Sequence, residues 1–345
     1  MRERALALSF LLIVPSLLHA QNYRLDLPWP SPHAAVSQVV GMTTLSVDYH
    51  RPGVNKRAIW GGLVPFDTVW RAGANENTVL SSTSAFTVGG TTLPAGRYGV
   101  FMIPTQTTWT IAFSKQSNAW GAFSYDPAED AVRFVVTPKA AEFTERLQYN
   151  FDDPTNTSVT LTMRWEKLAV SFPVTVNTSV VVLDSLKSQL RNLPRFWAPA
   201  WQQAAAWALA NTTNLDLPSV WADSAILLEP TFASYSVKAR VLDRQGKHAE
   251  ADSLRQAHLA SANEAELNAY GYLLVSQKKN NEALAIFLRV TKEYPDSWNA
   301  WDSLGEMYAT LGDKPKAVAN YKKALTLTTD PAQKKRINGI LAGLK

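Results

Sequence analysis

The stretch WDSLGEMYATLGDKPKAVANYKKAL, from Trp301 to Leu325, decides the fold of the C-terminal half of this chain. Its apolar residues recur at helical spacing in two segments joined by a turn, which predicts a pair of helices. Gly305 and Ala317 are small where the two helices are expected to cross closely, and Tyr308 and Tyr321 would fill the gaps between neighbouring pairs. One such pair cannot bury its apolar face alone, so the pattern predicts a stack of at least three.

The same pattern recurs about 34 residues upstream, which is the period of one helix–turn–helix repeat. Gly271, Ala283 and Phe287 take the positions of the small and aromatic residues, and Pro295 closes the unit. Further upstream the match weakens, and little beyond Ala249 survives. The spacing resembles the tetratricopeptide repeat family, clearly over residues 260–330 and weakly over 197–260, so three to four hairpins are expected.

The tetratricopeptide resemblance implies a groove that holds a protein or peptide partner. Some members of that family use lysines and asparagines of the first helix to bind a terminal carboxylate. Here Asp302 follows Trp301 and Glu306 lies one turn later, and these acidic groups would repel a carboxylate. The alternative is that the helical array only packs on the rest of the chain or on a second copy, since fold alone does not specify function.

The N-terminal half has a different period. In TTLSVDYH, residues 43–50, Leu45, Val47 and Tyr49 alternate with polar residues, which predicts a half-buried strand. Some nine or ten such strands up to Val176, without helical spacing between them, indicate an antiparallel β-sandwich or open barrel. The expected chain is therefore multi-domain, β then α: a β domain at 28–176, a linker helix at 177–196 and a tetratricopeptide-like helical solenoid at 197–345.

Residues 1–20, MRERALALSFLLIVPSLLHA, have the layout of a signal peptide: Arg2 and Arg4 precede an apolar run that is too short for a membrane span. The expected cleavage follows Ala20. The chain has no cysteine, so disulfides and cysteine-bound metals are excluded. We expect a periplasmic or secreted bacterial protein without a transmembrane segment. Its formal net charge is +5, but the basic residues alternate with acidic ones, so no nucleic-acid partner is expected.

The loop VPFDTVWRAGANENT, residues 64–78, raises the question of a binding site. One interpretation is an aromatic-walled pocket with a guanidinium, a carboxylate, an amide and an imidazole, suited to a polar small molecule such as a sugar. The other, which the sequence favours slightly, is that Arg71 pairs with Glu76 or Asp67 to fasten the loop while the tryptophans are core. The candidate binding residues are His50, Arg51, Trp60, Trp70, Arg71, Asn75 and Glu76.

Several stretches resemble one exported bacterial family, the domain-of-unknown-function family 2911. They are the segment from Ser31 to Thr78 with its VWRAGANE core, then LPAGRYGVFMIP and WTIAFSK. In that family a tetratricopeptide-like tail often follows. The resemblance spans residues 28–175 and implies no established reaction, substrate or cofactor.

Enzyme motifs are absent from the sequence: it has no nucleophile elbow, phosphate loop, zinc-protease helix or dinucleotide fingerprint. His33 and His50 match no metal-binding spacing, so neither a metal nor a cofactor is expected. The sequence favours a non-enzymatic binding or scaffold protein. The alternative is a carbohydrate-active or other hydrolytic enzyme around His50, Arg71 and Glu76, whose side chains would then have to lie within reach of one another.

Overall fold

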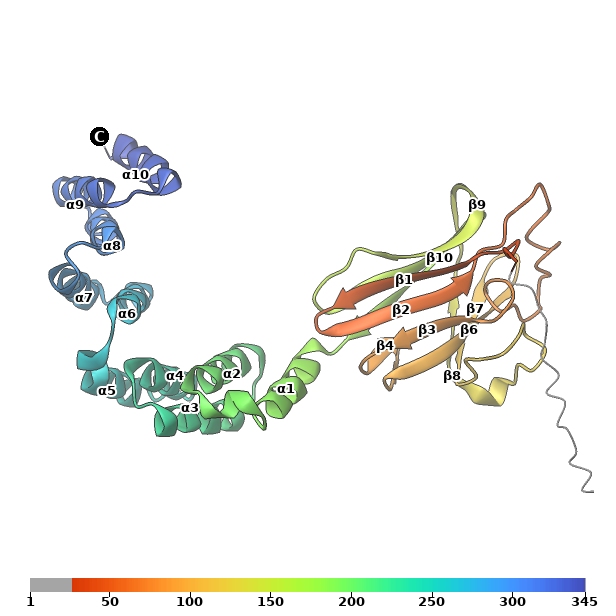
Figure 1. Cartoon of the computed structure of the whole chain (residues 1–345), viewed down its shortest axis with the longest axis horizontal. Coiled ribbons are helices and arrows are strands. Elements are labelled where there is room, and N and C mark those ends of the chain that lie inside the picture. Colours follow the sequence, from red (N-terminus) through yellow and green to blue (C-terminus); the bar gives the residue numbers. More distant parts are fainter. Residues whose placement is uncertain (1–26, 345) are drawn as a thin grey trace, which may run out of the picture. The chain divides into compact units, whose positions relative to one another are not determined.

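The computed structural model describes residues 27–344 and divides into two compact units, one ending at Asn177 and the other beginning at Thr178. Strands make up the first unit and helices the second (Figure 1). The expected signal peptide, residues 1–20, lies outside the described residues. In the part that is described, every helix is too short or too polar to cross a bilayer.

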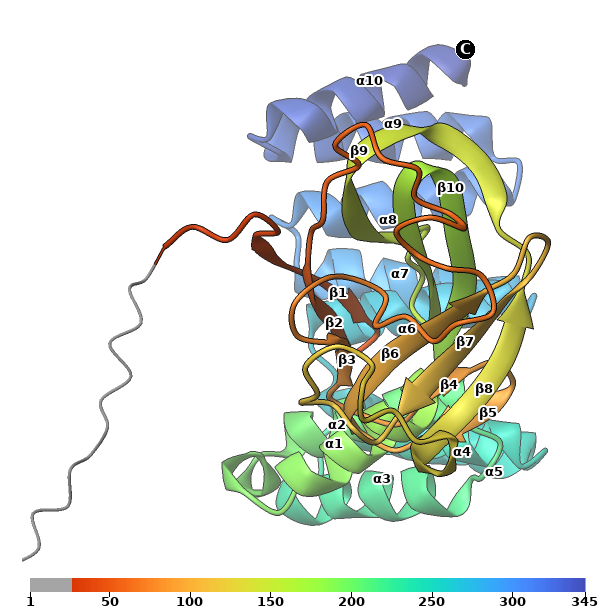
Figure 2. The ribbon, with the colours of Figure 1, turned by 90° about the vertical axis from the view of Figure 1, so that its right-hand side faces the viewer.

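The described part of the first unit has ten strands, joined into two antiparallel sheets. The six-stranded sheet has the order β1-β2-β3-β6-β7-β8 and the four-stranded sheet the order β5-β4-β10-β9 (Figures 1 and 2). This arrangement confirms the expected antiparallel β region ahead of the helices. The strands are β1 His33–Val40, β2 Thr43–His50, β3 Thr78–Ser82, β4 Phe86–Val88, β5 Thr91–Leu93, β6 Gly96–Pro104, β7 Trp109–Ser114, β8 Asp130–Val136, β9 Lys139–Asp152 and β10 Ser158–Val176.

The apolar faces of both sheets contribute to one hydrophobic core. The alternation in β2 buries Leu45, Val47 and Tyr49 as expected and leaves the residues between them on the outer face. Across the core, the ring of Tyr49 lies 4.9 Å from that of Tyr149 in β9. The period-two pattern alone therefore identified the buried face of β2.

The last strand of this unit is longer than the short strands expected from the sequence. The segments TSVTLTMRW and KLAVSFPVTV form one strand, β10, which continues through the polar residues Glu166 and Lys167. Glu166 has a φ of 56°, and the pairing with β9 shifts register on both sides of it. From Arg164 to Leu168, β10 advances four residues while its partner β9 advances eight, from Gln148 to Ala140, so β9 carries the extra residues and β10 continues through the polar pair.

Backbone bridges attach the long loop between β2 and β3 to both sheets. Gly53 forms an isolated bridge with Arg146 of β9, and Trp70 forms one with Met102 of β6. Backbone groups of a loop must find partners when the loop packs on the protein, and these bridges supply some of them. The segment VPFDTVWRAGANENT is therefore positioned by main-chain bonds.

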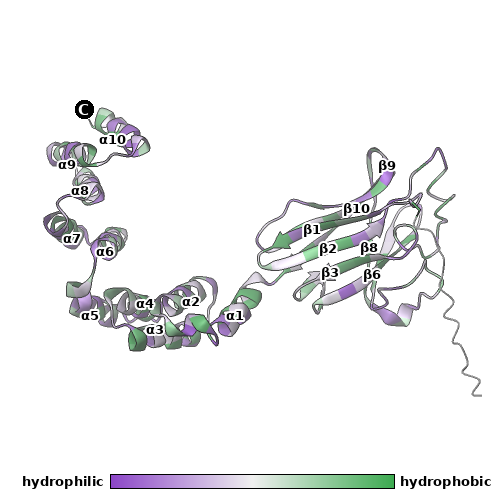
Figure 3. Ribbon diagram, in the orientation of Figure 1, coloured by the Kyte–Doolittle hydropathy of each residue, from purple (hydrophilic) through white to green (hydrophobic). Residues whose placement is uncertain are grey.

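The second unit consists of helices (Figure 1) that carry both hydrophobic and hydrophilic residues (Figure 3). Four consecutive pairs pack as hairpins, α2 with α3, α4 with α5, α6 with α7 and α8 with α9, and α10 follows α9. The helices are α1 Thr178–Gln189, α2 Ala198–Asn211, α3 Asp216–Leu228, α4 Phe232–Arg244, α5 His248–His258, α6 Glu264–Ser276, α7 Asn280–Glu293, α8 Trp298–Thr310, α9 Lys314–Leu327 and α10 Pro331–Gly343. Short 3₁₀ turns occur at Pro127–Glu129 in the first unit and at Leu193–Phe196 and Leu259–Ser261 in the second.

A small residue in the first helix of a hairpin receives a ring from the second helix. A Cβ on Gly271 would lie 2.7 Å from the ring of Phe287, and one on Gly305 would lie 3.1 Å from the ring of Tyr321. Tyr321 thus packs within its own hairpin, not only in the gap to the next one as expected. The close approach explains why both hairpins have glycine at this position.

The first two hairpins carry alanine at the corresponding place, the eighth residue of the first helix: Ala205 in α2 and Ala239 in α4. Sixteen residues later, where α7 and α9 have their rings, α3 has Trp221 but α5 has Arg255. Arg255 is nevertheless only 1% exposed. A charged side chain therefore occupies the ring position of the second hairpin.

Candidate functional site

The outer face of the six-stranded sheet brings polar residues from separate strands together. A two-residue turn at Gly41 and Met42 sets His33 of β1 opposite His50 of β2. Asp48 of β2, two residues before His50, is opposite Val79 of β3. His33, His50 and Asp48 alternate with the core-facing residues of their strands, and Val79, although buried, lies on the same face because it is opposite Asp48.

The strand β6 and the loops beside it contribute further residues to this face. In register, Val79 is opposite Gly99 and Ser81 is opposite Arg97. Together with the ends of neighbouring loops these residues enclose a cavity of about 400 Å³, which we call the outer-face cavity. It is lined by His33, Asp48, Tyr49, His50, Glu76, Asn77, Val79, Arg97, Ser117 and Asn118.

His50 and Glu76 meet in this cavity. The Nδ1 atom of His50 lies 3.4 Å from Oε2 of Glu76, and their side chains are 15% and 54% exposed. Burial lowers the pKa of His50 from its usual value; Glu76 opposes this shift, whereas His33 and Arg71 add to it. The lowered pKa favours the neutral imidazole near pH 7.

Arg71 lies near these groups without pairing with them. Within residues 27–344, no hydrogen bond or ion pair joins it to Glu76 or Asp67, and its buried Nε atom has no hydrogen-bond partner. Burial lowers its pKa, and the nearby Glu76 carboxylate opposes that shift. The fastening expected from an Arg71–carboxylate pair is thus not present in this form.

The loop is fastened by main-chain carbonyls instead. Ala72 has a φ of 55°, and its carbonyl oxygen accepts hydrogen bonds from the hydroxyls of Thr78 and Tyr149, at 2.9 and 2.8 Å. Asn75, with a φ of 58°, donates from its side-chain amide to the carbonyl of Ser31. A left-handed φ at a non-glycine residue costs free energy and persists only where the surroundings fix it.

Trp60 and Trp70 do not line the outer-face cavity. They form a cluster with Trp109 and Trp165, in which the Trp60 and Trp109 ring centroids lie 4.7 Å apart and Trp70 stacks on Trp165 at 5.8 Å. Their rings pack against the core between the sheets, so the expected aromatic wall beside His50 is not built from them. For these two residues the structure has the core placement that the second interpretation proposed.

Two other tryptophans lie near His50 and Glu76. The ring of Trp29 lies 6.4 Å from His50 and 6.1 Å from Trp120, which is 50% exposed and forms an isolated bridge with Glu76. Neither was a candidate from the sequence, because only the folded loops bring Trp29 to His50 and Trp120 to Trp29 and Glu76.

The side chain of Arg51 hydrogen-bonds to the main chain. Its Nε atom donates to the carbonyl of Leu147 in β9 at 3.0 Å, and its own carbonyl accepts from Arg146. Of the seven candidate residues, only His50 and Glu76 line the outer-face cavity. Its remaining polar residues were not among these candidates, although the Gly41–Met42 turn was a signal that could have placed His33 beside His50.

The site offers little for a metal ion. Across the described residues, no three or more histidine or acidic side chains gather closely enough to hold one. What the outer-face cavity can provide is hydrogen bonding and charge of both signs.

The helical unit has a groove between α4 and α6, with a volume of about 250 Å³. We call it the α4–α6 groove; it is lined by Phe232, Ala233, Ser236, Arg240, Arg255, Glu266, Ala269, Tyr270 and Leu273. Arg240 is exposed and has no hydrogen bond or ion pair to any described residue. An apolar floor with one unpaired cation at its edge suits an apolar side chain followed by an acidic one.

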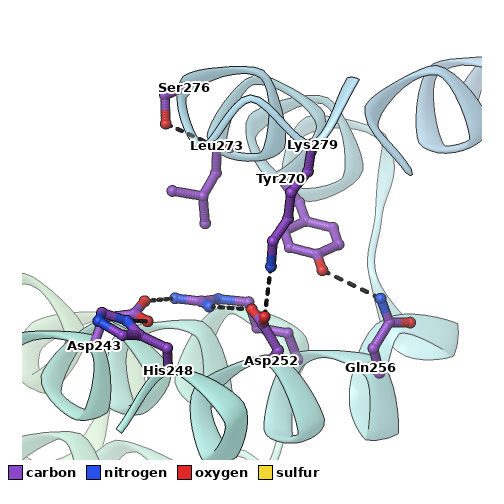
Figure 4. A network of polar contacts seen from close by, with 9 residues as sticks. Asp243, His248, Asp252, Gln256, Tyr270, Leu273, Ser276 and Lys279 are labelled. Carbon is purple, nitrogen blue, oxygen red and sulfur yellow. Dashed lines mark hydrogen bonds and ion pairs between the residues drawn. The ribbon is translucent and has the colours of Figure 1, made fainter. Parts of the chain in front are cut away.

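A polar network lies beneath this groove and joins the second hairpin to the third (Figure 4). The Nη2 atom of Arg255 donates to Asp243, and its Nη1 atom lies 3.3 Å from Asp252. Lys279, just before α7, reaches Asp252 at 2.5 Å. The buried charge of Arg255 is thus balanced by two carboxylates, one of which is shared with the next hairpin.

Asp302 and Glu306, the acidic residues of α8, already have partners within the protein. Asp302 is buried and pairs with Arg336 of α10 at 2.8 Å, while Glu306 accepts a hydrogen bond from the hydroxyl of Tyr272. Burial raises the pKa of Asp302, and Arg336 opposes this shift. Neither residue resembles a clamp for a terminal carboxylate.

Comparison with protein families agrees with both resemblances. Residues 31–174 match the family described as "Protein of unknown function (DUF2911)", and residues 299–331 match the tetratricopeptide repeat. The resemblances drawn from the sequence are thereby confirmed. No curated protein matches the chain.

Solved structures similar to this chain include tetratricopeptide proteins. Pseudomonas aeruginosa pilF is 24% identical over 43% of this chain and 67% of its own, with a TM-score of 0.33. YrrB, described as a TPR protein with an unusual peptide-binding site, is 18% identical over 47% of this chain and 84% of its own, with a TM-score of 0.32. MamA is 15% identical over 44% and 88%, with a TM-score of 0.32.

Proposed function

We propose that this chain, in which a DUF2911 domain precedes tetratricopeptide-type hairpins, is a non-enzymatic exported scaffold that binds a protein partner through its helices. The α4–α6 groove is the observation that carries this proposal. Its partner segment would place an apolar side chain on Phe232 and Tyr270 and an acidic side chain against Arg240. Such grooves gain affinity from a buried anchor and specificity from the charge beside it.

The groove can be blocked without disturbing the core. Ala269 is exposed in the groove, so Ala269→Glu would put both bulk and a repelling charge there. Ala257 is another exposed alanine, in α5, that does not line the groove, so Ala257→Glu is the matched control. We expect a full-length bait to lose its partner on Ala269→Glu and on Arg240→Glu but keep it on Ala257→Glu.

Equal capture by all these baits would exclude the groove as the binding surface. A chain that captures nothing specifically, at matched protein levels and with native circular dichroism, would count against the scaffold function as a whole.

Export is the second part of the proposal. It is supported by the charged start, the short apolar run and the small residue at Ala20 in the sequence. Expression in a bacterial host should yield an exported protein whose intact mass corresponds to a chain starting at Gln21. A full-length mass confined to the cytoplasmic fraction would rule this part out.

A hydrolytic enzyme is the second candidate function, and the 3.4 Å approach of His50 to Glu76 supports it. It ranks lower because no described hydroxyl hydrogen-bonds the imidazole of His50 as an activated nucleophile would. Hydrolysis of ester or glycoside reporters that disappears in His50→Gln would favour this function. The same rate in His50→Gln and the unmodified chain would eliminate it.

A further inference from the structure

The outer-face cavity contains charges of both signs that the protein itself leaves weakly compensated. Asp48 has His33 at 3.5 Å, and Glu76 has His50 at 3.4 Å. Arg97 reaches only the hydroxyl of Ser81, at 3.5 Å. Among residues 27–344, no arginine or lysine lies within 4.0 Å of either carboxylate, and no carboxylate within 4.0 Å of Arg97.

The sheet keeps these charges apart. Asp48 is on β2 and Arg97 on β6, with β3 between them and the two residues one row out of register. Strand spacing and rise place their Cα atoms on the order of 12 Å apart. Val79, which is buried and lines the cavity, forms an apolar floor between them. Asp48 and Arg97 therefore line one cavity without reaching each other, and Glu76, which also lines it, forms no ion pair with Arg97 among the described residues.

The rest of the lining supplies neutral hydrogen-bonding groups. Asn77 is buried, and its side-chain oxygen has no partner among the described residues, while its amide donates to Gln116. Ser117 and Asn118 complete the wall from the loop after β7. The cavity volume of about 400 Å³ falls at the small end of the range for ligand sites.

We infer that the outer-face cavity binds a small zwitterion with an ammonium group and a carboxylate, of the size of a dipeptide. The ammonium group lies between Asp48 and Glu76, and the carboxylate lies against Arg97. An anion would meet two carboxylates and a simple amine would make no use of Arg97, so a ligand with both charges forms charge-assisted hydrogen bonds with all three side chains.

The test uses calorimetry on the full chain with four free dipeptides, Ala-Ala, Ala-Lys, Ala-Glu and Ala-Phe. Each is compared with its N-acetylated and its C-amidated form. We expect at least one free dipeptide to bind, and either blocking group to weaken it about tenfold or more, because a charge-assisted hydrogen bond is lost. If no dipeptide binds up to about 10 mM, or if blocked and free forms bind equally, the inference is overturned.

Variants then assign the two ends. Arg97→Gln should weaken the free dipeptide and leave the C-amidated form unchanged, whereas Asp48→Asn and Glu76→Gln should abolish the penalty of N-acetylation. Lys139→Gln, which removes an exposed charge of β9 outside the cavity, is the control and should change nothing. The opposite pattern, or equal losses for all forms in every variant, would contradict the assignment.

Discussion

The hydroxyl of Tyr149 donates a hydrogen bond of 2.8 Å to the carbonyl oxygen of Ala72. Tyr149 belongs to the four-stranded sheet, and Ala72 lies in the long loop that ends at the six-stranded sheet. The bond is buried, and burial raises the pKa of Tyr149 well above its usual value, so the hydroxyl stays protonated as a donor. A loop that contributes Glu76 to a cavity is thus held from the opposite sheet.

Removing that hydroxyl should loosen the loop. Tyr149→Phe keeps the ring in the core and deletes only the donor, so we expect the free energy of unfolding to fall by about 1 kcal/mol in urea titrations. Thr144→Ala, which deletes an exposed hydroxyl bonded only two residues away, is the control and should have little effect. Equal stability of Tyr149→Phe and the unmodified chain would show that Thr78 alone holds the Ala72 carbonyl.

Glycine to alanine substitutions should have opposite effects in two helices of the second unit. Gly271→Ala would push a methyl group to within 2.7 Å of the buried ring of Phe287, and overpacking of this kind costs about 1–3 kcal/mol. Gly339 in α10 has open space where the Cβ of a larger residue would lie, so Gly339→Ala should stabilise the helix by up to about 1 kcal/mol. Thermal unfolding of both variants measures the difference, and stabilisation by both would disprove the close crossing.

The buried charge of Arg255 should depend on Asp243. Asp243→Asn removes one of the two carboxylates that pair with Arg255, whose side chain is 1% exposed. The loss of such a buried partner costs about 3 kcal/mol. Asp184→Asn breaks the exposed pair with Lys187 and should cost less than about 0.5 kcal/mol. Chemical denaturation of the two variants makes the comparison; similar losses would mean that Arg255 gains little from Asp243.

The imidazole of His50 should titrate below its usual pKa of 6.5. Because burial lowers the folded pKa below the unfolded one, the unfolded state takes up the proton first. The His50 contribution to stability is therefore present above pH 6.5 and is lost as the pH falls through the folded pKa. Proton NMR of the ring measures this pKa directly.

Variants of the neighbours check the cause of that shift. Glu76→Gln should lower the pKa of His50 further, since the carboxylate favours the imidazolium, and Arg71→Gln should raise it. An unchanged pKa in both variants would mean that neither charge acts on His50 in solution.

The sequence by itself determined the local structure. Alternation in TTLSVDYH fixes which face of β2 is buried, because successive side chains of a strand point to opposite faces. The spacing of Gly271 and Phe287, repeated at Gly305 and Tyr321, fixes the helical hairpins, because only a small residue admits a ring from the facing helix. Both signals arise from neighbours within one element or one hairpin.

Only the tertiary structure decided the site. His50 and Glu76 were within reach of sequence reasoning because a single loop joins them, but Arg97 enters the cavity through the register of β3 with β6. The sequence left both a cavity wall and the core open for Trp60 and Trp70 for the same reason: an aromatic side chain has the same composition signal in a core cluster as beside a cavity, and the difference lies in which sheet packs against it. Strand register and sheet packing depend on contacts between residues far apart in the chain, and no local period encodes them.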